Sequence, residues 1–398
     1  MPKTIEIPAR DLVKVADDPG KSSRLFNLVY VSPGEIGIFR KRAGKGFRYF
    51  FGKTQVTDEQ TLDRIRKLVI PPAWKDVWIC SRPNGHLQAT GTDVLGRKQY
   101  RYHALWNRLR SEAKFFRLSQ FGKAIPQVRN KLEEDVSEKK LSLNKVLAAM
   151  VMLMENTAMR IGNSFYEKLY GSFGLSTLKN RHVDVKGSRL RFAFKGKKDV
   201  MHSITLRSRR LAKVIKKCLD VPGKELFQYY DEEGVAHAVD SGMVNDYIRE
   251  ISGSEFTSKD FRTWTGTVIA LNACMARERA AAMNGQPASL AGRQKEVVSI
   301  LDEVAKRLGN TRTVTRKYYV HPAVIEEFEK GGLAGLFAKT KKNGSNELPG
   351  AVVPSQDEIP GIVEESDQIG KDGYTASERL LLKILAAHEK NAVIVTAG

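Results

Sequence analysis

The chain has 398 residues, of which 41% are hydrophobic, and its 66 lysines and arginines outnumber 45 acidic residues to give a formal net charge of +21. This length and apolar content suit about two ordinary domains, and the charge predicts an acidic partner, with nucleic acid the leading candidate. Residues 347–398 carry nine acidic and four basic residues, net −5, which leaves +26 on residues 1–346. The positive charge therefore belongs to the body of the protein, which weakens the alternative of a merely basic soluble protein.

Three scattered cysteines, Cys80, Cys218 and Cys274, form no Cys-x-x-Cys pair and have no histidine at ligand spacing. This argues for a reducing compartment and against structural zinc. The N-terminus lacks an apolar leader segment, and no run approaches membrane-spanning length. We therefore expect a soluble, cytoplasmic protein without a metal or a membrane partner.

From Leu28 to about Tyr102 the sequence breaks into short β-type runs separated by glycine and Pro-Asn-Gly turns. The runs are Gly37–Arg40, Phe47–Phe51, Asp76–Cys80, His86–Gly91 and Lys98–Tyr102. They predict a small antiparallel sheet, interrupted by one helix at about Asp58–Leu68.

After His103 the pattern becomes helical, and Leu143–Tyr170 repeats apolar residues at a period close to 3.6, which predicts one helix. A strand-rich insertion follows, at His182–Val185, Leu190–Phe194 and Val200–Leu206. Further helices are expected at about 208–219, 241–252, 266–283, 289–308 and 312–329.

The fold class is therefore α+β. We predict a β-rich N-terminal domain over residues 1–104 and a larger, mainly α domain with a β-hairpin insertion over residues 105–335. Residues 336–398 are rich in Gly, Pro, Ser and acids, which predicts a mostly disordered tail with room for one short helix at Ser377–Lys390.

A tyrosine pair, Tyr318 and Tyr319, follows two cations near the end of the basic body. A tyrosine hydroxyl is a weak nucleophile at neutral pH, but among guanidinium groups it can attack phosphorus and become a phosphotyrosine. The alternative for such a pair at a helix end is core packing. Arg160, late in an apolar helix, is costly to bury unless it meets an anion; its alternative is a pair with Glu155 or Glu167.

Two more basic residues lie in local sequence patterns that are compatible with phosphate binding. Lys197 lies in a turn between two predicted strands, where Gly196 lets the backbone approach a ligand; the alternative is a solvated turn. Arg262 precedes a predicted helix with Ser258 or Asp260 as its cap, and free N–H groups at a helix start favour phosphate. The alternative is a capped helix start whose charge happens to be basic.

Together these residues suit transesterification of a phosphodiester. Two guanidiniums match the charge that develops on the non-bridging oxygens, a lysine can protonate the departing 5′-oxygen, and a tyrosine attacks. The sequence has neither an acidic cluster resembling a Mg²⁺ site nor a Walker A motif, so we expect no metal, no ATP and no other cofactor.

Six segments carry a family pattern in one order: Pro71–Trp74, Gly96–Tyr102, Thr177–Val183, Phe194–Lys197, Lys259–Thr263 and Gly309–Tyr319. In these segments the chain resembles type IB DNA topoisomerases of the compact poxvirus and bacterial kind, from about Ile70 to Val320. The resemblance implies that Arg160 and Arg262 hold the scissile phosphate. It makes Lys197 the general acid, with Lys259 as a helper.

The same resemblance aligns Tyr319, rather than Tyr318, with the family nucleophile, and implies a 3′-phosphotyrosyl intermediate. At Asn310 the poxviral pattern has a histidine, so the bacterial branch is the better match. An amide still donates a hydrogen bond to a phosphate oxygen, although it carries no charge.

The resemblance further implies DNA contacts for five residues, because they match positions through which members of the family contact DNA: Arg97, Gln99, Tyr100, Tyr102 and Tyr166. For Tyr100 and Tyr102 the alternative is a pair of half-buried strand aromatics.

The resemblance implies a nucleoid-associated isomerase that relaxes supercoiled duplex DNA by single-strand cleavage and religation, acting as a monomer that closes around the duplex like a clamp. One alternative is a tyrosine recombinase, although those enzymes usually have histidine where this chain has Lys259. Another is a non-catalytic basic DNA-binding protein.

Overall fold

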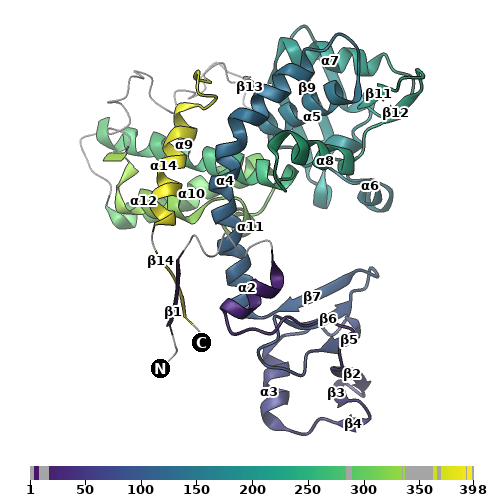
Figure 1. Cartoon of the computed structure of the whole chain (residues 1–398), viewed down its shortest axis with the longest axis vertical. Coiled ribbons are helices and arrows are strands. Elements are labelled where there is room, and N and C mark those ends of the chain that lie inside the picture. The colour runs from purple at the N-terminus through teal and green to yellow at the C-terminus, as the bar shows by residue number, and fades with distance from the viewer. Residues whose placement is uncertain are drawn as a thin grey trace. The chain divides into compact units, whose positions relative to one another are not determined.

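The computed structural model describes residues 4–8, 18–283, 289–333, 335–336, 362–364, 369–390 and 392–396 (Figure 1). The chain divides into two compact units, Met1–Arg117 with Glu389–Gly398, and Leu118–His388. The division falls inside the long helix α4 (Ala104–Val136), beyond the boundary predicted at residue 104.

The N-terminal unit is built on a six-stranded antiparallel sheet with strand order β4-β3-β2-β5-β6-β7. The strands are β2 (Ile38–Ala43), β3 (Gly46–Phe51), β4 (Thr54–Gln55), β5 (Lys75–Ile79), β6 (Leu87–Thr92) and β7 (Lys98–Tyr102). This confirms the predicted antiparallel sheet, and β4 is a short addition to it.

The two faces of that sheet are covered by different apolar clusters, because successive strand residues point to opposite sides. Ile38, Val77 and Ile79 pack with Ile65 of helix α3 (Glu59–Lys67), while Trp78 packs on the other face with Val31, Cys80 and Leu87. Helix α2 (Pro19–Leu25) precedes the sheet, and the Asp18 carboxylate caps it.

The larger unit surrounds α5 (Leu143–Thr157), a helix that is buried along nearly its whole length. Among the described residues, this unit also contains most of α4 and the helices α6 (Ser164–Tyr170), α7 (Arg209–Leu219), α8 (Ser241–Ser252), α9 (Ser258–Met283), α10 (Leu290–Leu308), α11 (Arg312–Tyr318), α12 (Pro322–Lys330) and α14 (Ala376–Glu389). A helix that is apolar all round must be covered on every side, so α5 fixes the centre of the core.

The three strands predicted for the insertion join β13, from the C-terminal segment, in a four-stranded sheet with order β13-β10-β9-β8. Its strands are β8 (Val183–Lys186), β9 (Arg189–Lys195), β10 (Met201–Arg207) and β13 (Ile362–Glu364). Leu190, Phe192 and Phe194 alternate inward along β9 and join the core. Two smaller strand pairs are found among the described residues: β11 (Gln228–Tyr230) with β12 (Ala236–Ala238) in this unit, and β1 (Thr4–Pro8) with β14 (Ala392–Thr396) in the N-terminal unit.

Three predicted helix bounds are wrong. The helix expected over Leu143–Tyr170 is broken into α5 and α6, because Ala158 adopts the left-handed conformation and caps α5. Helix α9 begins at Ser258 rather than at residue 266. The helix expected at 312–329 is two helices, α11 and α12, separated by Tyr319–His321, with Pro322 at the first position of α12.

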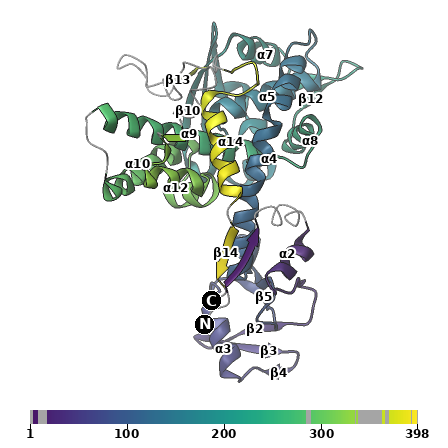
Figure 2. The same cartoon turned by 60° about the vertical axis from the view of Figure 1, so that its left-hand side comes forward.

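The prediction of a mostly disordered tail is wrong for β13, but its allowance for one helix near the end of the chain is confirmed by α14. Leu380, Leu381, Ile384 and Leu385 of α14 are buried in the main core, and α14 lies along α4 in both views (Figures 1 and 2). The short helix allowed for at Ser377–Lys390 is this element. The prediction of disorder for residues 337–361 concerns residues outside the described part of the chain. None of the helices in the described ranges is long and apolar enough to cross a membrane.

Candidate active site

Arg160 lies in the non-helical segment between α5 and α6. Gly162, with φ of 89°, permits this turn, and it packs against Gly174 so closely that a side chain would lie 2.9 Å from the Gly174 backbone. The Arg160 carbonyl accepts a 2.8 Å hydrogen bond from the amide of Leu175. The segment is therefore fixed by its own backbone, and the arginine side chain is available for other contacts.

The Arg160 guanidinium reaches the end of α10. It donates to the Gly309 carbonyl oxygen at 2.9 Å and to Asn310 Oδ1 at 2.5 Å. The alternative of a pair with Glu155 or Glu167 is wrong. Both carboxylates bind other cations, Arg129 and Lys179.

Arg262 belongs to the second turn of α9, not to the segment before it, and its side chain is only 5% exposed. It donates to the carbonyl oxygens of Ala158 and of Leu308, the latter at 2.9 Å. These carbonyls end α5 and α10, and helix C-termini offer unpaired, partly negative oxygens. The start of α9 is secured by Asp260, whose carboxylate accepts hydrogen bonds from Thr257.

The two arginines make this pocket strongly electropositive. Burial and the neighbouring Arg160 lower the pKa of Arg262 to about 10, and burial lowers the pKa of Arg160. Two donors here, Arg262 Nε and Asn310 Nδ2, are buried without a hydrogen-bond partner among the described residues. Buried donors are nearly always paired, so an anion that accepts from both would complete the pocket.

Tyr319 ends α11 and lies against Arg262, whose guanidinium carbon is 5.3 Å from the ring centroid. Its carbonyl accepts a 3.3 Å hydrogen bond from Thr267 Oγ1, and a side chain at Gly266 would come within 2.7 Å of that oxygen. Tyr318 is 40% exposed and lies beside Lys317. The structure thus brings Tyr319, and not Tyr318, to the arginines.

Lys197 lies in the turn that joins β9 to β10 and is exposed. The turn is closed by a 2.8 Å hydrogen bond from the Gly196 amide to the Val200 carbonyl. Lys197 lines one pocket with Arg160 and Arg262. Three residues of the predicted basic set therefore converge.

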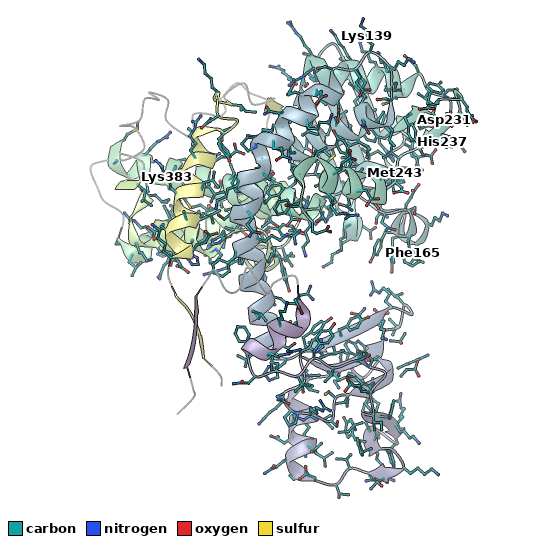
Figure 3. All side chains as sticks on the ribbon, viewed as in Figure 1. Lys139, Phe165, Asp231, His237, Met243 and Lys383 are labelled. Carbon is teal, nitrogen blue, oxygen red and sulfur yellow. The ribbon has the colours of Figure 1, made fainter. Side chains whose placement is uncertain are left out.

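Two other predicted residues of this unit lie outside that pocket. Lys259 is exposed in the first turn of α9. Tyr166 of α6 is 46% exposed, stacked on Tyr170 and in edge contact with Phe165, which is 58% exposed (Figure 3). This exposed aromatic group is a surface on which a ligand could stack, separate from the arginine pocket.

The predicted contact residues of the N-terminal unit gather on β7 and the turn before it. Arg97 forms a 2.7 Å ion pair with Asp93, and Gln99 donates to the same carboxylate at 2.9 Å. Tyr100, 46% exposed, stacks on half-buried Tyr102 with ring centroids 6.0 Å apart. Tyr102 thus packs inward, as the alternative of half-buried strand aromatics supposes, while Tyr100 faces solvent.

Sequence reasoning missed two residues that line the arginine pocket, His202 and Arg307. The alternation of β10 gave the only signal for His202, since it is two residues from the inward-facing Ile204. Among the described residues, no group of three or more His, Cys, Asp or Glu side chains is placed to hold a metal ion.

The comparisons with known proteins agree with this architecture. The family "Eukaryotic DNA topoisomerase I, catalytic core" matches residues 104–342, and "Bacterial DNA topoisomerase IB, N-terminal domain" matches residues 46–93. DNA topoisomerase 1B of Acanthamoeba polyphaga mimivirus is 33% identical over 298 residues, 74% of this chain and 88% of that protein. DNA topoisomerase 1B of vaccinia virus (strain Copenhagen) is 22% identical over 254 residues, 63% and 75% of the two chains.

Among solved structures, the XerH site-specific recombinase bound to palindromic difH substrate matches with a TM-score of 0.34 and 12% identity, over 55% of this chain and 52% of that one. The two family matches and the viral relatives define the class: the protein is an isomerase that acts on DNA. The chain belongs to the type IB DNA topoisomerase family and carries the N-terminal domain of the bacterial kind.

Proposed function

We propose that this protein relaxes supercoiled duplex DNA by cutting and resealing one strand through a covalent bond to Tyr319. The observation that carries the proposal is the pair of unsatisfied buried donors, Arg262 Nε and Asn310 Nδ2, beside that tyrosine. A phosphodiester placed there accepts from both donors and from Arg160. Its charge also relieves the repulsion between the two guanidiniums.

In the proposed step the Tyr319 oxygen attacks phosphorus, the bond from phosphorus to the 5′-oxygen breaks, and a 3′-phosphotyrosyl link remains. The phenolic proton leaves to water, while Lys197 gives a proton to the departing 5′-oxygen. The guanidiniums of Arg160 and Arg262 and the amide of Asn310 stabilise the charge on the non-bridging oxygens. Reversal of these transfers reseals the strand after the free 5′ end has rotated.

The residues outside the pocket are proposed to hold the duplex. Tyr166 and Tyr100 offer exposed rings, and Lys259, Arg97 and Gln99 offer donors to phosphate or base edges. Because Arg97 and Gln99 already bind Asp93, DNA must compete with that carboxylate. We further propose that the protein acts as a monomer that clamps DNA, in the cytoplasm on the nucleoid.

Relaxation of a supercoiled plasmid in EDTA without nucleotide tests the activity. The proposal predicts a ladder of relaxed topoisomers that reaches completion without ATP or added metal. An inactive wild-type protein across a range of salt concentrations would overturn it and leave DNA binding as the function. A strand-exchange assay on two duplexes separates the recombinase alternative, because relaxation without recombinants is expected.

A further inference from the structure

His202 is a pocket residue to which nothing above assigns a role. It lies on β10 directly opposite Phe194 of β9, and the two rings stack with centroids 5.1 Å apart at 20°. Its ring lines the same pocket as Arg160, Lys197 and Arg262. The stacking fixes the plane of the imidazole and therefore the direction in which the edge of the ring points.

That edge touches two glycines from distant parts of the chain. A methyl group on Gly196 would lie 2.5 Å from His202 Cδ2 and 2.6 Å from Nε2. A methyl group on Gly309 would lie 2.6 Å from His202 Cε1. The same imidazole edge therefore fills the space between the backbone just before Lys197 and the backbone just before Asn310.

Apart from their contacts with His202, the Gly309–Asn310 turn and the Gly196–Lys197 turn are stabilised by different interactions. The Gly309–Asn310 turn is anchored by hydrogen bonds from the Asn310 amide to the Ala305 carbonyl at 2.9 Å and from Arg160 to the Gly309 carbonyl at 2.9 Å. The turn after Gly196 is closed by the 2.8 Å hydrogen bond from the Gly196 amide to the Val200 carbonyl and by the 2.7 Å ion pair of Lys195 with Asp199, both of which lie within the β9–β10 hairpin itself, and its side chains are exposed from Lys197 onward. Loss of the His202 ring should thus free the lysine turn and leave the asparagine turn in place.

The imidazole acts through the space that it fills and not through a charge. Burial and the nearby guanidiniums of Arg160 and then Arg262 lower its pKa, so the ring is neutral at pH 7. A neutral ring adds no further cation to a pocket that is already lined by Arg160, Arg262, Arg307 and Lys197.

We propose that His202 is a positioning residue: its ring spaces the Gly196–Lys197 turn from the Gly309–Asn310 turn and so directs Lys197 to the leaving 5′-oxygen. This inference rests on the proposed function. A misplacement of about 1 Å in a reacting group can cost roughly 100-fold in rate. Loss of the ring should therefore slow the proton transfer by about that factor.

The test compares single-turnover cleavage of an ordinary duplex with cleavage of the same duplex carrying a 5′-bridging phosphorothiolate, whose thiolate leaves without a proton. For His202→Ala we expect cleavage of ordinary DNA to fall about 100-fold while the phosphorothiolate is cut at nearly the wild-type rate. Gly196→Ala should show the same pattern, because its methyl group pushes against the ring and Gly196 has an ordinary negative φ of −96°.

His237→Ala is the matched control. His237 lies on β12 beside Asp231, at the β11–β12 hairpin and outside the pocket lining (Figure 3). The His237→Ala variant should cut both substrates at the wild-type rates. Equal slowing of His202→Ala on both substrates, or wild-type rates on both, would overturn the inference while wild-type cleavage upholds the proposed function. Failure of the wild type to form an adduct with either substrate would overturn both.

Discussion

Arg160 and Asn310 are joined by a 2.5 Å hydrogen bond although 150 residues separate them in the chain. The bond uses the oxygen of the asparagine amide, and the amide nitrogen is a buried donor without a partner among the described residues. The neutral amide thus orients a guanidinium, and in the proposed function it would also offer one hydrogen to the phosphate.

Replacing Arg262 by lysine should reduce single-turnover cleavage by about 100-fold or more. Lysine keeps the charge but cannot contact two carbonyls and a phosphate at once. DNA binding should change only a few-fold, since most of the positive charge lies elsewhere. Quantifying the covalent adduct on denaturing gels, with DNA binding measured in parallel, checks this.

The control for that variant is Arg249→Lys on α8, an arginine that is exposed and paired with Asp246. It should cleave normally. Near-normal cleavage by Arg262→Lys would contradict the role proposed for Arg262, the stabilisation of charge on the non-bridging oxygens by its guanidinium.

Lys197→Ala should cut ordinary DNA at least about 100-fold more slowly, the usual contribution of a general acid. A 5′-bridging phosphorothiolate should restore its rate, because sulfur leaves as the thiolate. Lys198→Ala, in the same exposed turn, provides the control and should behave like the wild type. If the phosphorothiolate fails to rescue Lys197→Ala, the lysine is not the proton donor.

Glu378→Ala should lower the free energy of unfolding of the larger unit by about 3 kcal/mol. Glu378 is 4% exposed, binds Arg129 at 2.8 Å and accepts a hydrogen bond from the Trp264 indole at 2.9 Å. Its loss therefore removes one acceptor from each of these two donors. Urea denaturation measures the change. Lys390→Ala, an exposed position just beyond α14, should have no measurable effect, and an equally stable Glu378→Ala protein would show that the tail helix is dispensable for the core.

Stability should fall as the pH drops from 7 to about 5.5. Burial lowers the pKa values of His86, His103, His182 and His202, the last also through Arg160 and Arg262. Below the unfolded value of about 6.5 the unfolded chain binds more protons than the folded one, so protonation favours unfolding. Denaturation midpoints at several pH values check the sign; higher stability at pH 5.5 than at pH 7 would contradict it.

Periodicity and composition sufficed for the sheet of the N-terminal unit and for the identity of most helices, because both depend on local apolar patterns. The positions of Arg160 and Tyr319 were harder. Each lies where an expected helix breaks, at Ala158 and before Pro322 respectively. The break after α5 is imposed by tertiary contacts, such as the close approach of Gly162 to Gly174, which no short sequence window contains.

The tail shows the same limit in another way. Its acidic, glycine-rich composition suggested disorder, yet α14 is held by the long-range ion pair between Arg129 and Glu378. Likewise His202 escaped notice because its partners, Gly196 and Gly309, are far apart in the chain. The contacts of Arg129 with Glu378 and of His202 with Gly309 join residues that lie too far apart in the chain to leave a local signature.

The most direct test of the account is covalent trapping of radiolabelled duplex DNA by the wild type, Tyr318→Phe and Tyr319→Phe on denaturing gels. Because Tyr319 lies against Arg262 while Tyr318 faces solvent beside Lys317, we predict adducts with the wild type and Tyr318→Phe and none with Tyr319→Phe. An adduct formed by Tyr319→Phe but lost in Tyr318→Phe would contradict the assignment of the nucleophile. Absence of any adduct with the wild-type protein would contradict the proposed chemistry itself.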